Sequence, residues 1–189
     1  MAGIPTARLS FFHFFGLIVP GYFFTISLLI LFGQYIFSFI DSLELPSGPV
    51  RDFLMYPLLI LVSGPIMGYF LLTISQRLFL RRLYHSSEID ILKTDELDLE
   101  APPHIFQDIM DLVGMQVFAL NTAVAFLIIA ILTPIHSVVS KNYSILWLAP
   151  CFAILSFLFY DGAKMLTYRI CDKYRAIKSW KRKHFSNRS

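Results

Sequence analysis

Six polar side chains that could take part in acid–base or ion chemistry interrupt the long apolar runs of this sequence. Runs of this length are typical of membrane helices. A central aspartate or arginine costs ~2.5 to 3.5 kcal/mol on insertion scales, so such groups tend to face the interior of a bundle and pair there. We therefore predict a polar intramembrane layer formed by His13, Arg77, Gln116, Asn121, Asp161 and Lys164.

Asp161 is the most informative member of this layer. Its carboxylate could accept a hydrogen bond from Lys164, Arg77 or Asn121. One interpretation is a carboxylate that relays protons or binds ions. The other is a structural contact that fixes helix register, or a residue shallow enough to reach headgroup water. We favour the structural interpretation because Asp161 lies close to the end of its apolar run, and it predicts a cationic or amide partner within the bundle.

The sequence contains no complete catalytic motif. His104 and Asp108 are four residues apart, which makes them neighbours on one helix face rather than a catalytic pair. Phosphate loops and the Gly-x-Ser-x-Gly and His-Glu-x-x-His motifs are absent. The five histidines pair with no cysteine at metal-ligand spacing. We therefore predict no metal, no cofactor and no catalytic residue.

The composition of the chain is that of a membrane protein. Apolar residues make up 56% of the 189 residues and charged residues only 15%, with a mean hydropathy of +0.63. These values are outside the range of ordinary soluble domains. The net charge is +3, and the charged residues are concentrated between and after the apolar runs. This distribution argues against a nucleic-acid partner. Cys151 and Cys171 would lie ~30 Å apart on one helix, too far for a disulfide.

Four apolar runs are long enough to cross a hydrocarbon core of ~30 Å as helices. The first run, residues 9–40, exceeds one crossing, and Pro20 followed by Gly21 predicts a break. We expect an N-terminal interfacial helix at 9–19 and a span from Pro20, with a single tilted and kinked helix as the alternative. Pro134 and His136 are expected to close the third span. The predicted spans are about 20–40, 55–80, 114–135 and 145–167.

Small residues recur four positions apart in three of the predicted spans. In lipid such pairs let helix backbones approach closely, because hydrophobicity cannot drive association there. Glycine is also common in membrane helices, so one pair alone carries little weight. Together the pairs predict a tightly packed bundle through Gly64 and Gly68, Ala119 and Ala123, and Ala149 and Ala153.

Two helices are predicted to continue beyond the bilayer. The third helix is expected to begin near Pro103, because proline is favoured in a first turn. The fourth has an amphipathic continuation to about residue 181. Apolar side chains on both continuations recur at helical spacing, so we expect them to pack together. The predicted seam consists of Ile105, Ile109, Tyr174, Ile177 and Trp180.

Two segments of opposite charge accompany these continuations. Residues 83–112 carry eight acidic side chains against Lys93, a net charge of −7, and residues 169–189 carry eight basic side chains against Asp172, a net charge of +7. We predict a cytoplasmic acidic loop and a cytoplasmic basic tail, because basic residues mark the cytoplasmic ends of spans. The tail could cap the loop or bind anionic lipid. Its candidate residues are Arg169, Lys173, Arg175, Lys178, Trp180, Lys181, Arg182 and Lys183.

The sequence thus predicts an all-α integral membrane protein, a four-span helical bundle with an N-terminal interfacial helix, cytoplasmic extensions of the third and fourth helices, and both termini in the cytoplasm. The preferred function is that of a non-enzymatic membrane-complex subunit or oligomeric effector, acting in the lipid bilayer through contacts with copies of itself or with other membrane subunits. An ion or small-solute channel or transporter using the polar layer around Asp161 is the alternative. A membrane-embedded lipid-modifying enzyme is the third hypothesis.

Overall fold

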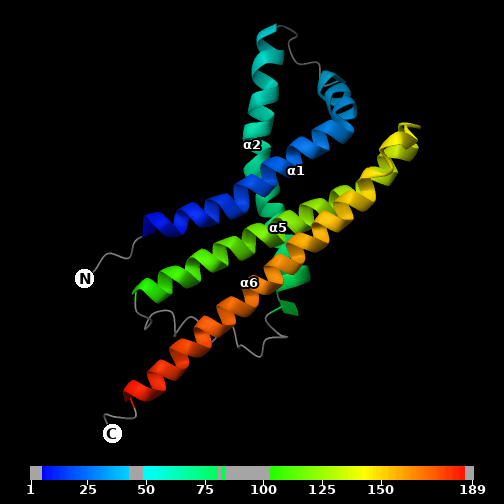
Figure 1. Cartoon of the computed structure of the whole chain (residues 1–189). Coiled ribbons are helices and arrows are strands. Elements are labelled where there is room, and N and C mark those ends of the chain that lie inside the picture. Colours follow the sequence, from blue (N-terminus) through cyan, green and yellow to red (C-terminus); the bar gives the residue numbers. More distant parts are fainter. Residues whose placement is uncertain (1–5, 43–48, 81, 84–102, 186–189) are drawn as a thin grey trace.

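The computed structural model describes residues 6–42, 49–80, 82–83 and 103–185, and the elements within these ranges are helical (Figure 1). A π-helix, η1 (Gln76–Leu80), continues the second long helix, and a 3₁₀-helix, η3 (Tyr143–Ile145), lies in the turn before the last one. The four long helices are α1 (Thr6–Ser42), α2 (Pro49–Ser75), α5 (Pro103–Val139) and α6 (Leu148–Phe185).

Each long helix contains a segment that is long and apolar enough to cross a membrane. The protein is therefore an all-α membrane protein with four candidate spans, as predicted. Most of the predicted acidic loop, residues 84–102, lies outside the described residues. The four segments are Phe15–Ile36, Pro57–Leu80, Gln107–Val139 and Tyr143–Ser179.

Two prolines that were expected to end helices lie inside them instead. α1 runs without interruption from Thr6 to Ser42 and includes Pro20, so the separate interfacial helix is absent and the alternative of a single helix is confirmed. α5 likewise includes Pro134 and continues to Val139. Proline removes one backbone donor, but in a membrane the helix can continue where neighbouring groups satisfy the freed carbonyl.

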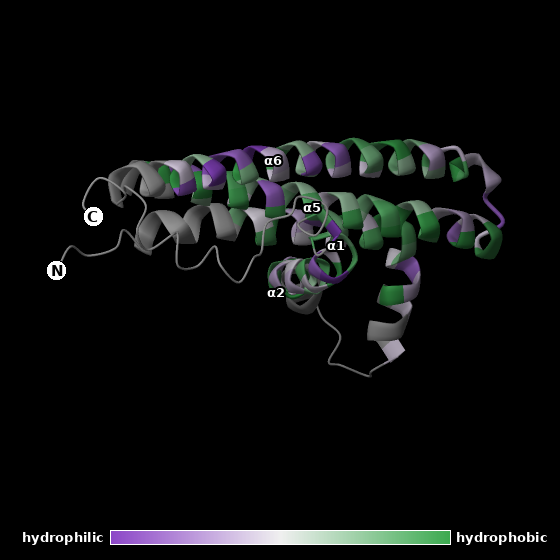
Figure 2. Cartoon of the chain, turned by 90° about the horizontal axis from the view of Figure 1, so that it is seen from below, coloured by the Kyte–Doolittle hydropathy of each residue, from purple (hydrophilic) through white to green (hydrophobic). Residues whose placement is uncertain are grey.

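α5 is the central helix and α6 lies at the edge of the assembly. α5 and α6 run side by side in opposite directions, while α1 and α2 pack on α5 from its other side (Figures 1 and 2). α2 crosses the other helices steeply in Figure 1. In the most apolar stretch of α5, 61% of the residues are buried, whereas the corresponding share in α6 is 6%. α6 therefore presents most of its surface to the outside of the protein.

The largest apolar core forms where α1, α2 and α5 meet. Phe24 of α1 and Leu71 of α2 are buried against Val124, Ala125 and Ile129 of α5. In lipid such contacts stabilise the protein through close van der Waals packing rather than through the removal of water. The relative positions of these three helices therefore depend on close packing at this core.

The continuations of α5 and α6 form the predicted apolar seam. Ile109 of α5 is buried against Tyr174 and Ile177 of α6, and Ile105 packs on the same cluster. The side chain of Trp180 lies outside the described residues. For the four described members of the seam, the prediction from helical spacing is confirmed.

A short turn joins α5 to α6. Lys141 adopts a positive φ of 54° there, and the side chain of Asn142 accepts a hydrogen bond from the backbone nitrogen of Ser144 (3.3 Å). The Ser137 hydroxyl donates to the carbonyl oxygen of Asn142 (3.0 Å). These bonds close the turn, and α6 begins at Leu148, a little later than the sequence predicted.

Candidate functional site

Asn121 joins three helices at a fully buried point of α5. Its Nδ2 donates a hydrogen bond to the carbonyl oxygen of Gly16 in α1 (2.8 Å). The Ser75 hydroxyl, at the end of α2, donates to Asn121 Oδ1 (2.7 Å). Leaving a buried donor or acceptor unpaired costs ~1 to 3 kcal/mol. These two bonds therefore fix α1, α2 and α5 relative to one another.

The carbonyl of Gly16 is the one that Pro20 leaves without a partner in α1. In an α-helix the N–H of each residue donates to the carbonyl four residues earlier, and proline has no N–H. Asn121 supplies the missing donor from a neighbouring helix, as side chains can do for proline in membrane helices. This contact explains how α1 continues through the fully buried Pro20.

Three glycines bring the backbones of α1 and α2 into contact. A Cβ added at Gly21 would collide with the carbonyl oxygen of Gly64 and would lie 2.6 Å from the Gly68 nitrogen. A Cβ at Gly68 would collide with the carbonyl oxygen of Leu17, and one at Gly64 would collide with the ring of Tyr22. The predicted pair Gly64 and Gly68 therefore packs against α1 of the same chain.

Two buried hydrogen bonds join α5 to α6. Gln116 Nε2 donates to Thr167 Oγ1 (2.6 Å), and the Ser156 hydroxyl donates to the carbonyl oxygen of Ala123 (2.8 Å). Ala119 and Ala123 are both buried. This predicted pair of small residues lies where α6 packs on α5, and the hydrogen bonds fix the register of the two helices.

Asp161 lies on the outside of α6 and, contrary to the prediction, has no partner within the described part of the bundle. Its side chain is exposed, and among the described residues it makes no hydrogen bond or ion pair, even with Lys164 three residues later. The expected polar layer is thus divided, with Gln116 and Asn121 inside the bundle and the two charged groups outside it. α6 is apolar on several sides within its span, so its sequence did not distinguish the inner face from the outer one.

The exposed face of α6 around Asp161 and Lys164 is otherwise apolar. Figure 2 shows polar bands within the apolar part of this helix. Apolar and aromatic side chains on both sides of the two charges are more than half exposed, and no other described helix covers them. We name this surface the α6 face, and it comprises Ile154, Phe157, Leu158, Asp161, Lys164, Met165 and Tyr168.

Among the described side chains, the other residues predicted for the intramembrane layer and for packing do not meet at one place. Arg77 is exposed in η1, and the side chain of His13 lies outside the described residues. Ala153 is exposed and Ala149 is half-buried. This last pair therefore forms no tight interface with the other described residues, and packing against a partner helix stays a prediction for it.

The basic side chains of the α6 continuation differ in their contacts. Lys173 forms an ion pair with Asp108 of α5 (2.9 Å), and Arg175 forms one with Asp172 on α6 itself (3.3 Å). All four groups are substantially exposed, and exposed pairs of this kind contribute only ~0 to 1 kcal/mol. Arg169 and Lys178 are exposed and make no such contact within the described part of the chain. The side chains of Trp180, Lys181, Arg182 and Lys183 lie outside the described residues.

Sequence reasoning missed the hydrogen-bond role of Ser75 and the π-helix that follows it. A π-helix widens the backbone turn and is common at functional sites, and here it directly follows the residue that bonds to Asn121. The sequence did contain one signal for the hydrogen bonds of Asn121. A proline inside an apolar run requires a donor from elsewhere, and Asn121 is one of the few amides in the predicted spans.

The described residues contain no group of three or more side chains placed to hold a metal ion. Both cysteines are free thiols, Cys151 exposed and Cys171 buried. No family model matches the chain, and no curated protein or solved structure is similar to it. The α6 face, with two charged groups among exposed apolar side chains, is the candidate site.

Proposed function

We propose that this protein is a non-enzymatic membrane protein that acts through helix–helix contacts, as an oligomer or as a subunit of a membrane complex, with the α6 face as its contact surface. The observation that carries the proposal is the position of Asp161 and Lys164 among exposed apolar side chains within a candidate span. A partner that pairs these charges lowers the cost of holding them in lipid, which is ~2.5 to 3.5 kcal/mol for a central aspartate on insertion scales.

Asp161 needs a partner more than Lys164 does. A lysine can extend its four-carbon stem along the helix and place its ammonium group at the headgroup level. The aspartate side chain is too short to do this, so its carboxylate stays at the depth of its own backbone. A neighbouring helix with a cation at the same depth is therefore the partner that best fits this surface.

A second copy of the chain supplies such a cation. Two copies inserted in the same direction have parallel α6 helices, related by a two-fold axis along the membrane normal. Asp161 and Lys164 are separated by ~4.5 Å along the helix axis, so the carboxylate of each copy can reach the ammonium of the other. The interface then holds two reciprocal ion pairs flanked by Phe157 and Tyr168.

We further propose that the termini and both charged segments lie in the cytoplasm. Lysine and arginine in short loops set the orientation of spans. Arg77 lies near the end of the second span and Arg82 follows that span. The basic continuation follows the apolar part of the fourth span, whereas the turn between α5 and α6 contains only Lys141. This distribution supports a cytoplasmic position for the ends of α2 and α6.

The mass of the protein in nanodiscs tests the oligomer, and charge reversal tests the α6 face. The wild type is expected to be a dimer. Asp161→Lys and Lys164→Asp alone each place like charges opposite each other and are expected to give monomers. The double variant restores opposite charges and is expected to restore the dimer.

Asp172→Lys is the matched control, because it reverses an exposed acidic residue of the same helix outside the α6 face. It is expected to leave the mass unchanged. A wild type that is monomeric alone, yet crosslinks to another membrane protein through a cysteine at position 157, would replace the second copy with a partner subunit. Monomers without any such crosslink would contradict the proposal.

A further inference from the structure

We propose that α5 and α6 hold a zwitterionic glycerophospholipid in a groove that runs along one side of their packed pair. Two hollows line this side, one of about 450 Å³ within the span and one of about 500 Å³ on the continuations, and Arg169 lines both. We name the two together the α5–α6 groove. Its span half is lined by Ala119, Leu158, Phe159, Gly162, Met165 and Leu166, and its outer half by Asp108, Asp111, Leu112, Met115, Asp172, Lys173 and Ala176.

The span half of the groove suits an acyl chain. Apart from Arg169, the side chains that line it are apolar. Gly162 leaves its floor open, because a Cβ added there would meet nothing within 4 Å. From Leu158 to Arg169 the helix rises ~16 Å, which gives a chain an extended apolar surface. An acyl chain that lies here is held by van der Waals contacts on both helices.

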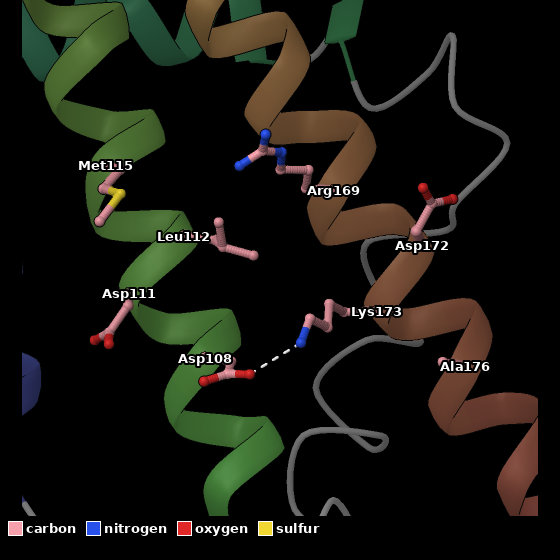
Figure 3. A pocket seen from close by; sticks show the side chains of 8 residues that line it. All are labelled: Asp108, Asp111, Leu112, Met115, Arg169, Asp172, Lys173 and Ala176. Carbon is pink, nitrogen blue, oxygen red and sulfur yellow. Dashed lines mark hydrogen bonds and ion pairs between the residues drawn. The ribbon is translucent and has the colours of Figure 1, made fainter.

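Arg169 is placed to bind the phosphate of such a lipid. It lies where the apolar half of the groove meets the charged half, and its guanidinium reaches toward α5 (Figure 3). No hydrogen bond or ion pair occupies it among the described residues. A guanidinium binds phosphate through two parallel hydrogen bonds, which are stronger than neutral ones. Of the carboxylates in the outer half, Asp108 is paired with Lys173 and Asp172 with Arg175, and Asp111 accepts a hydrogen bond from Gln107.

The outer half of the groove favours a headgroup that also carries a positive charge. Three carboxylates and two cations line this half, so the lining has a net charge of −1. An anionic headgroup would be repelled by Asp111, which pairs with no cation among the described residues, whereas an ammonium group beyond the phosphate finds this carboxylate in the lining. The charge of the lining therefore points to phosphatidylethanolamine-type lipids rather than phosphatidylglycerol-type lipids.

The lipid site and the α6 face are adjoining surfaces that share Leu158 and Met165 at their common edge but differ in the residues that carry each proposal. Neither Asp161 nor Lys164 lines the groove, and Arg169 and Gly162 are not part of the α6 face. The lipid proposal therefore does not depend on the oligomer. If one of the two proposals is contradicted, the other is unaffected. An experiment that reports both the mass of the protein and the bound lipid distinguishes them.

Native mass spectrometry of the full chain released from detergent micelles tests the groove. Phosphatidylethanolamine, phosphatidylcholine or phosphatidylglycerol is added at equal concentration, and retained lipid is counted. We expect phosphatidylethanolamine to be retained most and phosphatidylglycerol least. Arg169→Ala removes a charge-assisted contact and is expected to lower retention about tenfold. Gly162→Leu fills the groove and is expected to lower it similarly.

Each variant has a control on the same helix outside the groove. Ala153→Leu enlarges an exposed small residue of the span, and Lys178→Ala removes an exposed cation of the continuation. Both are expected to retain lipid like the wild type. Should Gly162→Leu lose its helical content, Leu166→Trp fills the groove from a half-buried position outside the α6 face instead.

Three results would overturn the proposal. Equal retention of the three lipids in the wild type would indicate only a bulk lipid shell. Loss of lipid in the controls as large as in the groove variants would show that the groove is not the site. Displacement of the lipid by soluble glycerophosphoethanolamine would show that the headgroup binds without the apolar half.

Discussion

Asn121 Nδ2 lies 2.8 Å from the carbonyl oxygen of Gly16, the oxygen that Pro20 leaves without a helical donor. The proline and the asparagine therefore act as a matched pair on two helices. Beside them, Gly21 brings α1 into backbone contact with α2. The position of α1 thus depends on a polar contact and on a close approach at neighbouring residues.

Asn121→Leu is expected to destabilise the protein by ~1 to 3 kcal/mol, because it leaves the Gly16 carbonyl buried without a donor. The free energy of unfolding is measured by denaturant titration of the protein in detergent micelles. In a Pro20→Ala background the helix supplies its own N–H to Gly16, so the same substitution is expected to cost less. Equal costs in the two backgrounds would show that Asn121 does not compensate for the proline.

Gly21→Ala is expected to cost ~1 to 3 kcal/mol or more, because the new methyl group collides with the backbone of Gly64 at the α1–α2 crossing. Gly162→Ala is the matched control, since a Cβ there meets nothing within 4 Å. Thermal unfolding in detergent compares the two. Similar midpoints for both variants would mean that α1 and α2 do not cross as closely as described.

Ile109→Ala is expected to destabilise the seam by ~2 to 5 kcal/mol, because it opens a cavity at a fully buried position. Lys173→Ala removes the nearby ion pair and is expected to cost under ~1 kcal/mol, since both partners are about half exposed. Hydrogen exchange of the α5 and α6 continuations measures both effects. A larger effect for the lysine, or one that persists in high salt, would contradict this ranking.

Cysteines introduced on a chain without its native thiols test the orientation. A cysteine at exposed Asn142 is expected to react with an impermeant reagent added to intact cells, because it lies in the turn assigned to the outside. One at exposed Ser179 is expected to react only after permeabilisation. The opposite pattern would reverse the proposed orientation, and equal labelling of both sites in intact cells would indicate mixed insertion.

Several features of the fold could be predicted from the sequence because they depend on local chemistry. The length of the apolar runs predicted four spans. Helical spacing predicted the seam of Ile105 and Ile109 with Tyr174 and Ile177, since on the continuations water makes the apolar side of a helix distinguishable from its polar side. The start of α5 at Pro103 followed from the preference of proline for a first turn.

The helix boundaries at Pro20 and Pro134 and the direction of Asp161 were decided by the tertiary structure. Whether a proline ends a helix in lipid depends on a donor from elsewhere in the fold, and for Pro20 that donor is Asn121, 101 positions along the chain. Inside the span of α6 both the lipid side and the protein side accept apolar side chains. Periodicity therefore could not tell them apart, and only the packing of α6 on α5 placed Asp161 outside and Gln116 inside.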